Sequence, residues 1–267
     1  MVIFRLLSSI IFLLCGMQTL ADEKLPQEFT AMRSALCDKP SDFTETGCRV
    51  CPGFMAKSSE APAMLNGALE INSILLGSFT SDGNAEALLG SGSCFSHADG
   101  FASAFLLRKE QGSWHRLSFF HREGPIGICW KIPGQGGARD LLICNQEDYG
   151  TGAIRVMGLD DHGKVKTDST LLQTWRNPIR ALEKQKHCSS LEADVKKISF
   201  KSIEVSIFLN SFDVNPPINC FDESEGTSSK ISNSKKIEGV AVFIRNDDIF
   251  AADERTKKLL SEVEESR

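Results

Sequence analysis

The sequence predicts a mainly β protein built from repeated antiparallel hairpins. We interpret these hairpins as a degenerate or partial β-propeller, with a two-sheet sandwich as the alternative. The main observation is a Gly-rich segment, 77–89, whose pattern returns as 130–142. Gly83, for example, recurs as Gly136, which is 53 positions later (136 − 83). A fixed offset of this size is typical of one supersecondary unit used twice. Short helices near the ends and several disulfides complete the prediction.

Each copy has the pattern of a hairpin, because apolar residues run up to a Gly-rich turn and an apolar pair leaves it. A second hairpin follows each copy, at 100–117 and at 152–166. A weaker third version spans 239–250. In that version the two-residue strand period places three apolar side chains on one face: Val240, Val242 and Ile244. Two hairpins make four strands, as in a propeller blade.

The segment Gly77–Leu88 resembles the FG-GAP or VCBS-type repeat of integrin-like β-propellers. The family has a Gly-Asp-Phe-Asn-Gly-Asp-Gly turn followed by an acidic residue, and the residues that match are Gly77, Phe79, Asp82, Gly83 and Glu86. Ser78 and Thr80 stand where the family has its first two calcium ligands. The second copy loses nearly every carboxylate through Lys131, Pro133, Gln135 and Arg139. Since calcium needs about six to eight oxygen ligands, we expect no structural calcium, no other metal and no cofactor.

The chain begins with the pattern of a secretory signal peptide, residues 1–21. Arg5 gives a positive start, an apolar run follows, and Thr19-Leu20-Ala21 is a small-x-small cleavage site. The run is too short to anchor the protein in a bilayer. We expect one mainly β domain over 22–250 and a charged tail over 251–267. Within the domain we expect a Cys-rich cap (22–67), two hairpin repeats (68–175) and a degenerate third unit (176–250).

Four further segments have recognisable patterns. Pro26–Leu36 is predicted to be a short helix, and Ile179–His187 a second helix, because Asn177-Pro178 has the pattern of a helix start. Ile198–Leu209 is predicted to form strands, with a bulge or turn near Lys201 where the apolar phase changes. Asp222–Lys236 is rich in Ser, Lys and Glu and is predicted to be an exposed loop.

Composition limits the classes of partner. The formal net charge of −5 argues against nucleic acid and anionic membranes as partners. No segment after residue 21 has the pattern of a transmembrane helix. Of 9 cysteines, one lies in the expected signal peptide, and an even number in an exported chain favours disulfides. We therefore expect a secreted or periplasmic protein whose partner is an unknown protein or envelope component.

Turn geometry predicts one disulfide directly. A turn centred between Gly136 and Gly137 places residues whose numbers sum to 273 opposite each other, and Cys129 and Cys144 satisfy that sum. Directly opposite residues have Cα atoms about 4.5–5.5 Å apart, which suits a disulfide. Cys188 and Cys220 then form the most plausible C-terminal pair. Three pairings remain open for the other four cysteines: Cys37, Cys48, Cys51 and Cys94.

Three motifs suggest chemistry, and a structural reading competes with each. Cys48-Arg-Val-Cys51 has redox spacing but lies in a Pro/Gly loop, so structural disulfides are favoured. Gly158–Lys164 has the spacing of a phosphate loop, but Val165 replaces the Ser or Thr of that motif and a hairpin turn is favoured. Trp114, Trp130 and Trp175 could form a sugar platform. Burial is favoured for most of them, because the chain has 17 Phe and 1 Tyr.

The candidate acid/base residues are His97, Asp99, His115 and His121. His97 and Asp99 lie in a predicted loop, where functional residues are common. No G-x-S-x-G or H-E-x-x-H motif accompanies them. The favoured function is therefore a non-catalytic binding or envelope-structural protein. The alternative is an exported hydrolase that uses His97 and Asp99 with His115 or His121.

Overall fold

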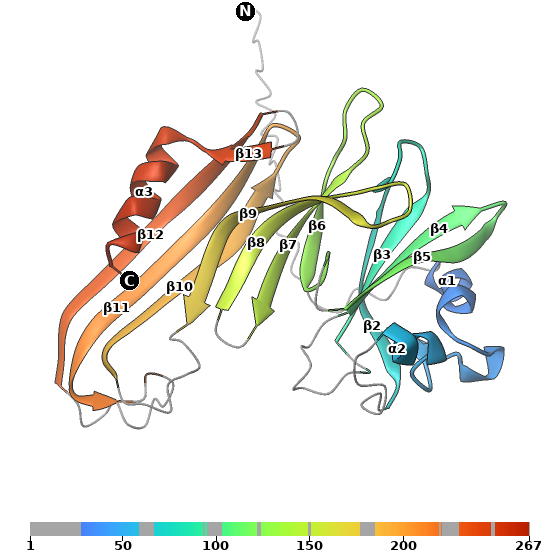
Figure 1. The fold of residues 1–267 in the computed structure, drawn as a ribbon, viewed down its shortest axis with the longest axis horizontal. Coiled ribbons are helices and arrows are strands. Elements are labelled where there is room, and N and C mark those ends of the chain that lie inside the picture. Colours follow the sequence, from blue (N-terminus) through green and yellow to red (C-terminus); the bar gives the residue numbers. More distant parts are fainter. Residues whose placement is uncertain are drawn as a thin grey trace, which may run out of the picture.

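A computed structural model describes residues 28–58, 67–92, 94, 103–121, 124–148, 151–176, 185–218, 220, 230–246 and 249–266. The expected signal peptide lies outside these residues. The predicted mainly antiparallel β fold is confirmed. The strands form one five-stranded sheet and one eight-stranded sheet, and each sheet follows the chain order from strand to neighbouring strand (Figure 1).

The five-stranded sheet carries the N-terminal cap. Its strands are β1 (Gly47–Cys48), β2 (Leu69–Gly77), β3 (Glu86–Ser91), β4 (Ser103–Glu110) and β5 (Ser113–His121). The cap contributes helix α1 (Phe29–Leu36), the 3-10 helix η1 (Pro40–Asp42) and helix α2 (Gly53–Ser58). The predicted first helix is confirmed by α1, which buries Phe29, Met32 and Leu36 against the sheet.

The eight-stranded sheet contains the rest of the chain. Its strands are β6 (Ile128–Ile132), β7 (Leu141–Asp148), β8 (Thr151–Leu159), β9 (Val165–Arg176), β10 (Gln185–Ile198), β11 (Ser202–Ile218), β12 (Lys230–Asn246) and β13 (Ile249–Ala252). The sheet curls until β13 contacts β9. Helix α3 (Glu254–Glu264) follows β13 and runs beside β12 (Figure 1), so the predicted charged tail is largely helical.

The expected four-stranded blades are absent from the described sheets, which have five and eight strands. The two sheets instead share an apolar core, which is closer to the two-sheet alternative. Phe79, Leu88 and Leu106 from the smaller sheet pack there with Leu142 and Met157 from the larger one. A shared core between large sheets buries apolar faces that a separate blade would bury against neighbouring blades.

Both segments of the predicted repeat lie in β-hairpins. Gly77 pairs with Glu86 across the β2–β3 loop, and Ile132 pairs with Leu141 across the β6–β7 loop. The β2–β3 loop (78–85) and the β6–β7 loop (133–140) have equal length. The structural offset is 55 (132 − 77 and 141 − 86), whereas the glycine pattern recurs at 53. The two hairpins therefore do not align at the offset of the sequence pattern, and the repeat stays a prediction.

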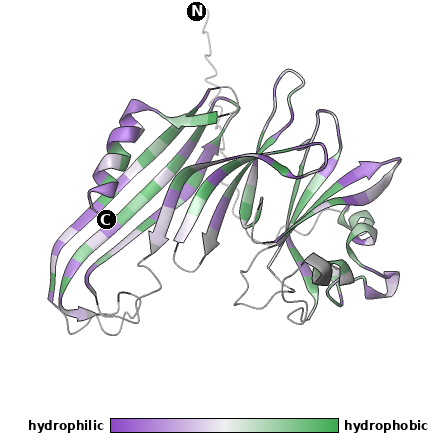
Figure 2. Ribbon diagram, in the orientation of Figure 1, coloured by the Kyte–Doolittle hydropathy of each residue, from purple (hydrophilic) through white to green (hydrophobic). Residues whose placement is uncertain are grey.

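The long strands β10–β12 form a sheet with two different faces. Apolar and polar residues alternate along them (Figure 2). The face toward the core contains Ile203, Val205, Ile207 and Leu209, all buried, and α3 adds Val263 to the same core. The opposite face carries Val240 and Ile244, which are exposed. The predicted common face of Val240, Val242 and Ile244 is thus the outer face of the sheet.

Two predicted elements need correction. The helix expected over Ile179–His187 falls partly outside the described residues, and its end belongs to strand β10, where His187 pairs with Asp213. The loop expected over Asp222–Lys236 also falls partly outside them, but β12 begins at Lys230 and pairs with β11. Both errors arose because local composition carries no information about a strand partner distant in sequence. The phase change near Lys201 is the turn between β10 and β11.

Four disulfides join the described cysteines. Cys129 pairs with Cys144, directly opposite each other on β6 and β7 with Cα atoms 4.1 Å apart. Cys188 pairs with Cys220. Both pairings are those expected from the sequence. The open pairings resolve as Cys37–Cys48 within the cap and Cys51–Cys94 between the cap and the end of β3.

Candidate functional site

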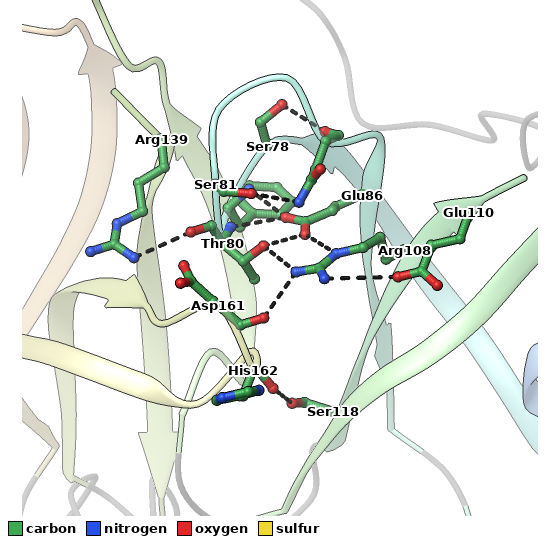
Figure 3. Close-up of polar contacts among 12 residues, drawn as sticks. Ser78, Thr80, Ser81, Glu86, Arg108, Glu110, Ser118, Arg139, Asp161 and His162 are labelled. Atoms are coloured by element: carbon green, nitrogen blue, oxygen red, sulfur yellow. Dashed lines mark hydrogen bonds and ion pairs between the residues drawn. The ribbon is translucent and has the colours of Figure 1, made fainter. Parts of the chain in front are cut away.

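Three loops meet where the two sheets join. They are the β2–β3 loop (78–85), the β6–β7 loop (133–140) and the β8–β9 turn (160–164). Polar groups from all three, side chains and backbone carbonyl oxygens, gather around Glu86 and Arg108 (Figure 3). We call this cluster the Glu86–Arg108 clasp.

The centre of the clasp is a buried carboxylate. Glu86 begins β3, and its side chain has no exposed surface. The backbone N–H groups of Phe79 and Thr80 donate to its Oε2 over 2.7 and 2.9 Å. The Thr80 hydroxyl donates to Oε1, and Arg108 Nε donates to the same oxygen over 2.9 Å. Four donors therefore satisfy a carboxylate that burial alone would disfavour.

Arg108 connects that carboxylate to the other sheet. It lies on β4 opposite Glu86, and its side chain is 17% exposed. Its Nη2 donates to Thr80 Oγ1 over 2.5 Å and to the carbonyl oxygen of Asp161 over 3.0 Å. One guanidinium thus joins the β2–β3 loop, strand β4 and the β8–β9 turn. A planar fork with several donors is suited to such a junction.

Direct contacts between the two repeated loops complete the cluster. Ser78 N donates to the Asp140 carboxylate and Asp140 N donates to the Ser78 carbonyl oxygen, each over 2.9 Å. Arg139 donates to the Thr80 carbonyl oxygen over 3.3 Å and to that of Leu159. On the far side, Ser118 Oγ donates to the His162 carbonyl oxygen over 3.0 Å. All of these bonds except that from Arg139 to Leu159 join one sheet to the other.

The clasp has the chemistry of a structural joint. A carboxylate that acts as a general acid or base must reach substrate or water, but the Glu86 oxygens are buried and bonded by donors from their own chain. The negative charge of the Glu86 carboxylate is paired with the guanidinium of Arg108. Among the described residues, no group of three or more His, Cys, Asp or Glu side chains could hold a metal ion.

The predicted acid/base residues are not assembled into one described site. His97 and Asp99 lie outside the described residues. His115 and His121 lie near opposite ends of β5, where His115 pairs with Arg108 and His121 with Ser103. The hydrolase prediction needed His115 or His121 to lie close to His97 and Asp99. Of these four residues the structure describes only His115 and His121.

A second polar cluster crosses the ends of three long strands. His187 Nδ1 on β10 lies 2.7 Å from Asp213 Oδ1 on β11, and Asn233 Nδ2 on β12 donates to Asp213 Oδ2 over 2.7 Å. The strands change register here, and Asn233 has a left-handed φ of 50°. These hydrogen bonds lower the pKa of Asp213, the one from Asn233 most strongly and then the one from His187. Asp213 thereby fixes the orientation of the imidazole ring.

Other motifs have structural roles. Cys48 and Cys51 bond to different cysteines, Cys37 and Cys94, so the C-x-x-C spacing is not a dithiol pair. Gly158–Lys164 contains the β8–β9 turn, as the hairpin interpretation predicted. Trp114 and Trp175 are buried and Trp130 is partly buried, which confirms the expected burial of most Trp residues.

Sequence analysis noted Glu86 only as a residue that matches the repeat family, and it missed the partner Arg108. Arg108 follows an apolar run at the end of a strand, where an arginine ordinarily indicates a solvated edge. Its role depends on Glu86, 22 residues away. The cluster of His187, Asp213 and Asn233 was missed for the same reason, because it unites three strands that are separated in the sequence. The available signal for Arg108 was the tendency of opposite charges to pair across neighbouring strands, which places Arg108 directly opposite Glu86.

No protein-family model matches the chain, and a search of curated proteins also gives no match. None of the helices in the described part of the chain has the length and apolar character needed to cross a membrane.

Proposed function

We propose that this chain is an exported, non-catalytic binding module. The four disulfides support an oxidising compartment. The expected signal peptide over 1–21 supports export, with cleavage after Ala21. The disulfides and the Glu86–Arg108 clasp together make a rigid scaffold, which lowers the entropy lost when a partner binds.

The observation that carries the proposal is a row of exposed aliphatic side chains on the outer face of β12 and β13. Val240, Ile244 and Ile249 are 44%, 50% and 63% exposed. Val242 lies between Val240 and Ile244 on the same face. We call these four residues the β12 column. Contiguous apolar residues on a protein surface commonly mark an interaction site, and a rigid sheet face presents them in a fixed arrangement.

Site-specific photo-crosslinking in the producing cell tests this function. A photoreactive residue replaces Ile244 in one variant and Val50 in a control variant. Val50 is similarly exposed, at 49%, but lies in the cap. We expect a discrete protein adduct from position 244 and none from position 50. Equal adducts from both positions, or none from position 244, would contradict a binding role for this face.

A hydrolase is a second candidate, now based on His187 and Asp213 rather than on the predicted loop pair. A carboxylate bonded to Nδ1 fixes the imidazole tautomer and leaves Nε2 as a potential general base. Hydrolysis of p-nitrophenyl esters by the purified protein tests this candidate. His187→Ala must lower the rate well below that of wild type, and His115→Ala must not. Equal rates in all three proteins would exclude it.

A further inference from the structure

We infer that the Cys51–Cys94 disulfide is a redox-sensitive latch that holds helix α2 on the smaller sheet. The bond joins the cap, just before α2, to the segment that follows β3. A dithiol that opens the bond releases α2 and exposes the surface beneath it. This inference goes beyond the proposed binding function and does not depend on it.

An external thiol can approach the latch from the side of Cys51. Thiol–disulfide exchange requires access to one of the two sulfur atoms, and exposed or strained disulfides are the labile ones. Cys51 is partly exposed, whereas Cys94 is buried. In the Cys37–Cys48 bond, by contrast, both cysteines are buried. Attack on the latch therefore falls on the Sγ atom of Cys51.

The other partly exposed disulfides join paired strands, which keep their cysteines together after reduction. Cys129 and Cys144 lie directly opposite each other on β6 and β7. Cys188 lies on β10, and Cys220 follows the end of its neighbour β11. Thiols that remain adjacent re-form their bond readily, because its closure orders little additional chain. The latch instead joins the cap to the segment after β3, so its two thiols can separate.

The backbone of Cys94 is strained in the closed state. Its φ is 77°, in the left-handed region that is costly for a residue with a side chain. In the described part of the chain, the non-glycine residues with positive φ are Cys94, Gln111 and Asn233. Cys94 is thus the one cysteine among them. Opening the latch lets this backbone relax, which favours the reduced form.

Helix α2 covers an aromatic surface of the sheet. The ring of Phe54 packs edge-on against Phe105 of β4 and Phe119 of β5, with centroids 6.0 and 5.7 Å away. Met55 beside it is completely buried. Helix α2 has six residues, and isolated helices shorter than about 12 residues are marginal in water. Once α2 is released, we expect it to unfold and to expose Phe105 and Phe119.

The opening reaction is a two-electron exchange with a dithiol. One thiolate of the dithiol attacks Cys51 Sγ, the disulfide bond breaks, and Cys94 leaves as a thiolate that takes a proton from water. The second thiolate of the dithiol then attacks the mixed disulfide and releases Cys51, which is protonated in turn. The two cysteines are reduced to thiols, and the dithiol is oxidised to an intramolecular disulfide.

A titration of the native mature chain with dithiothreitol tests the latch. Free thiols are alkylated at each concentration and located by peptide mapping, and the fluorescence of a dye that binds exposed apolar surface is recorded in parallel. We expect Cys51 and Cys94 to be alkylated first, with a several-fold rise in dye fluorescence at the same concentration. Another disulfide that opens first, or a latch that opens without the rise, overturns the inference.

Paired serine variants test whether the dye signal comes from this bond. Cys51→Ser/Cys94→Ser should show the high fluorescence without reductant. Cys129→Ser/Cys144→Ser is the matched control, and it should show low fluorescence until dithiothreitol is added. Equal fluorescence of the two variants without reductant contradicts the latch. If the first variant fails to fold, the titration of the wild-type chain still decides.

Discussion

Arg108 Nε on β4 lies 2.9 Å from Glu86 Oε1 on β3, and Nη2 of the same guanidinium donates to the Asp161 carbonyl oxygen beside the larger sheet. Glu86 is the acceptor for the β2–β3 loop, and Arg108 carries the connection onward to the β8–β9 turn. Removing one partner of a buried ion pair leaves the other charge without compensation, which costs more than the pair contributes. The contact therefore leads to a strong prediction about stability.

Arg108→Met should lower the free energy of unfolding by about 3–5 kcal/mol, because it leaves the Glu86 carboxylate buried without its cation. Urea denaturation at neutral pH measures the loss. Lys257→Ala is the control, since it breaks an exposed ion pair with Glu254 and should cost about 0.5 kcal/mol or less. An Arg108→Met variant as stable as that control would show that the clasp contributes little.

Calcium should leave the melting temperature unchanged. Ser78 and Thr80 supply no carboxylate, and Glu86 already bonds Arg108 and three other donors. A calcium ion would have to displace the guanidinium. Thermal melts with excess calcium and with a chelator test this, after exhaustive dialysis against the chelator. A shift of several degrees between the two conditions would mean that calcium binds the folded protein.

Acid should remove a stabilising contribution from Asp160. The backbone N–H of Lys164 donates to its carboxylate over 2.8 Å and that of His162 over 3.0 Å, and these bonds, that of Lys164 most strongly, lower its pKa from 3.8. The contribution is complete above pH 3.8, the unfolded value, and is lost as the pH falls through the lower folded value. Asp160→Asn should therefore be less stable than wild type at neutral pH, and the difference should shrink in acid. Urea midpoints across this pH range measure it, and a difference that grows in acid would contradict the sign.

The sequence predicted features that depend on neighbours along the chain. The Cys129–Cys144 pairing follows from the centre of one short turn, and the structure pairs Cys129 opposite Cys144. Helix α1 follows from the spacing of Phe29, Met32 and Leu36. In both cases the interacting residues are close in sequence, so spacing alone fixes their relative positions.

Features that depend on distant pairing were missed. The end of the expected second helix is strand β10 because His187 has Asp213 as its cross-strand partner. The blade prediction failed because hairpin patterns do not specify how many hairpins join one sheet. The outer position of Val240 and Ile244 could not be predicted either, since alternation defines two faces of a strand but not which face is buried.

The remaining prediction concerns Val242 of β12, which Thr256 contacts just beyond the end of the β12–β13 pairing. Thr256 is completely buried. Its Oγ1 accepts from Val242 N over 2.7 Å and donates to the Val242 carbonyl oxygen over 3.2 Å. The backbone N–H of Thr256 donates over 2.7 Å to Asp253, the N-cap residue of α3. The first turn of α3 is thus bonded to β12 at Val242 through one buried hydroxyl.

Thr256→Val keeps the shape of the side chain but leaves the Val242 N–H without its acceptor. We expect a loss of about 1–3 kcal/mol in the free energy of unfolding, the cost of an unsatisfied buried donor. Thr256→Ser keeps the hydroxyl and removes one methyl group, so it should cost about 0.8 kcal/mol. Urea denaturation ranks the two variants, and hydrogen exchange at Val242 locates the effect. If the serine variant is the less stable one, packing of the methyl group holds α3 on β12, and the hydroxyl bridge to Val242 does not.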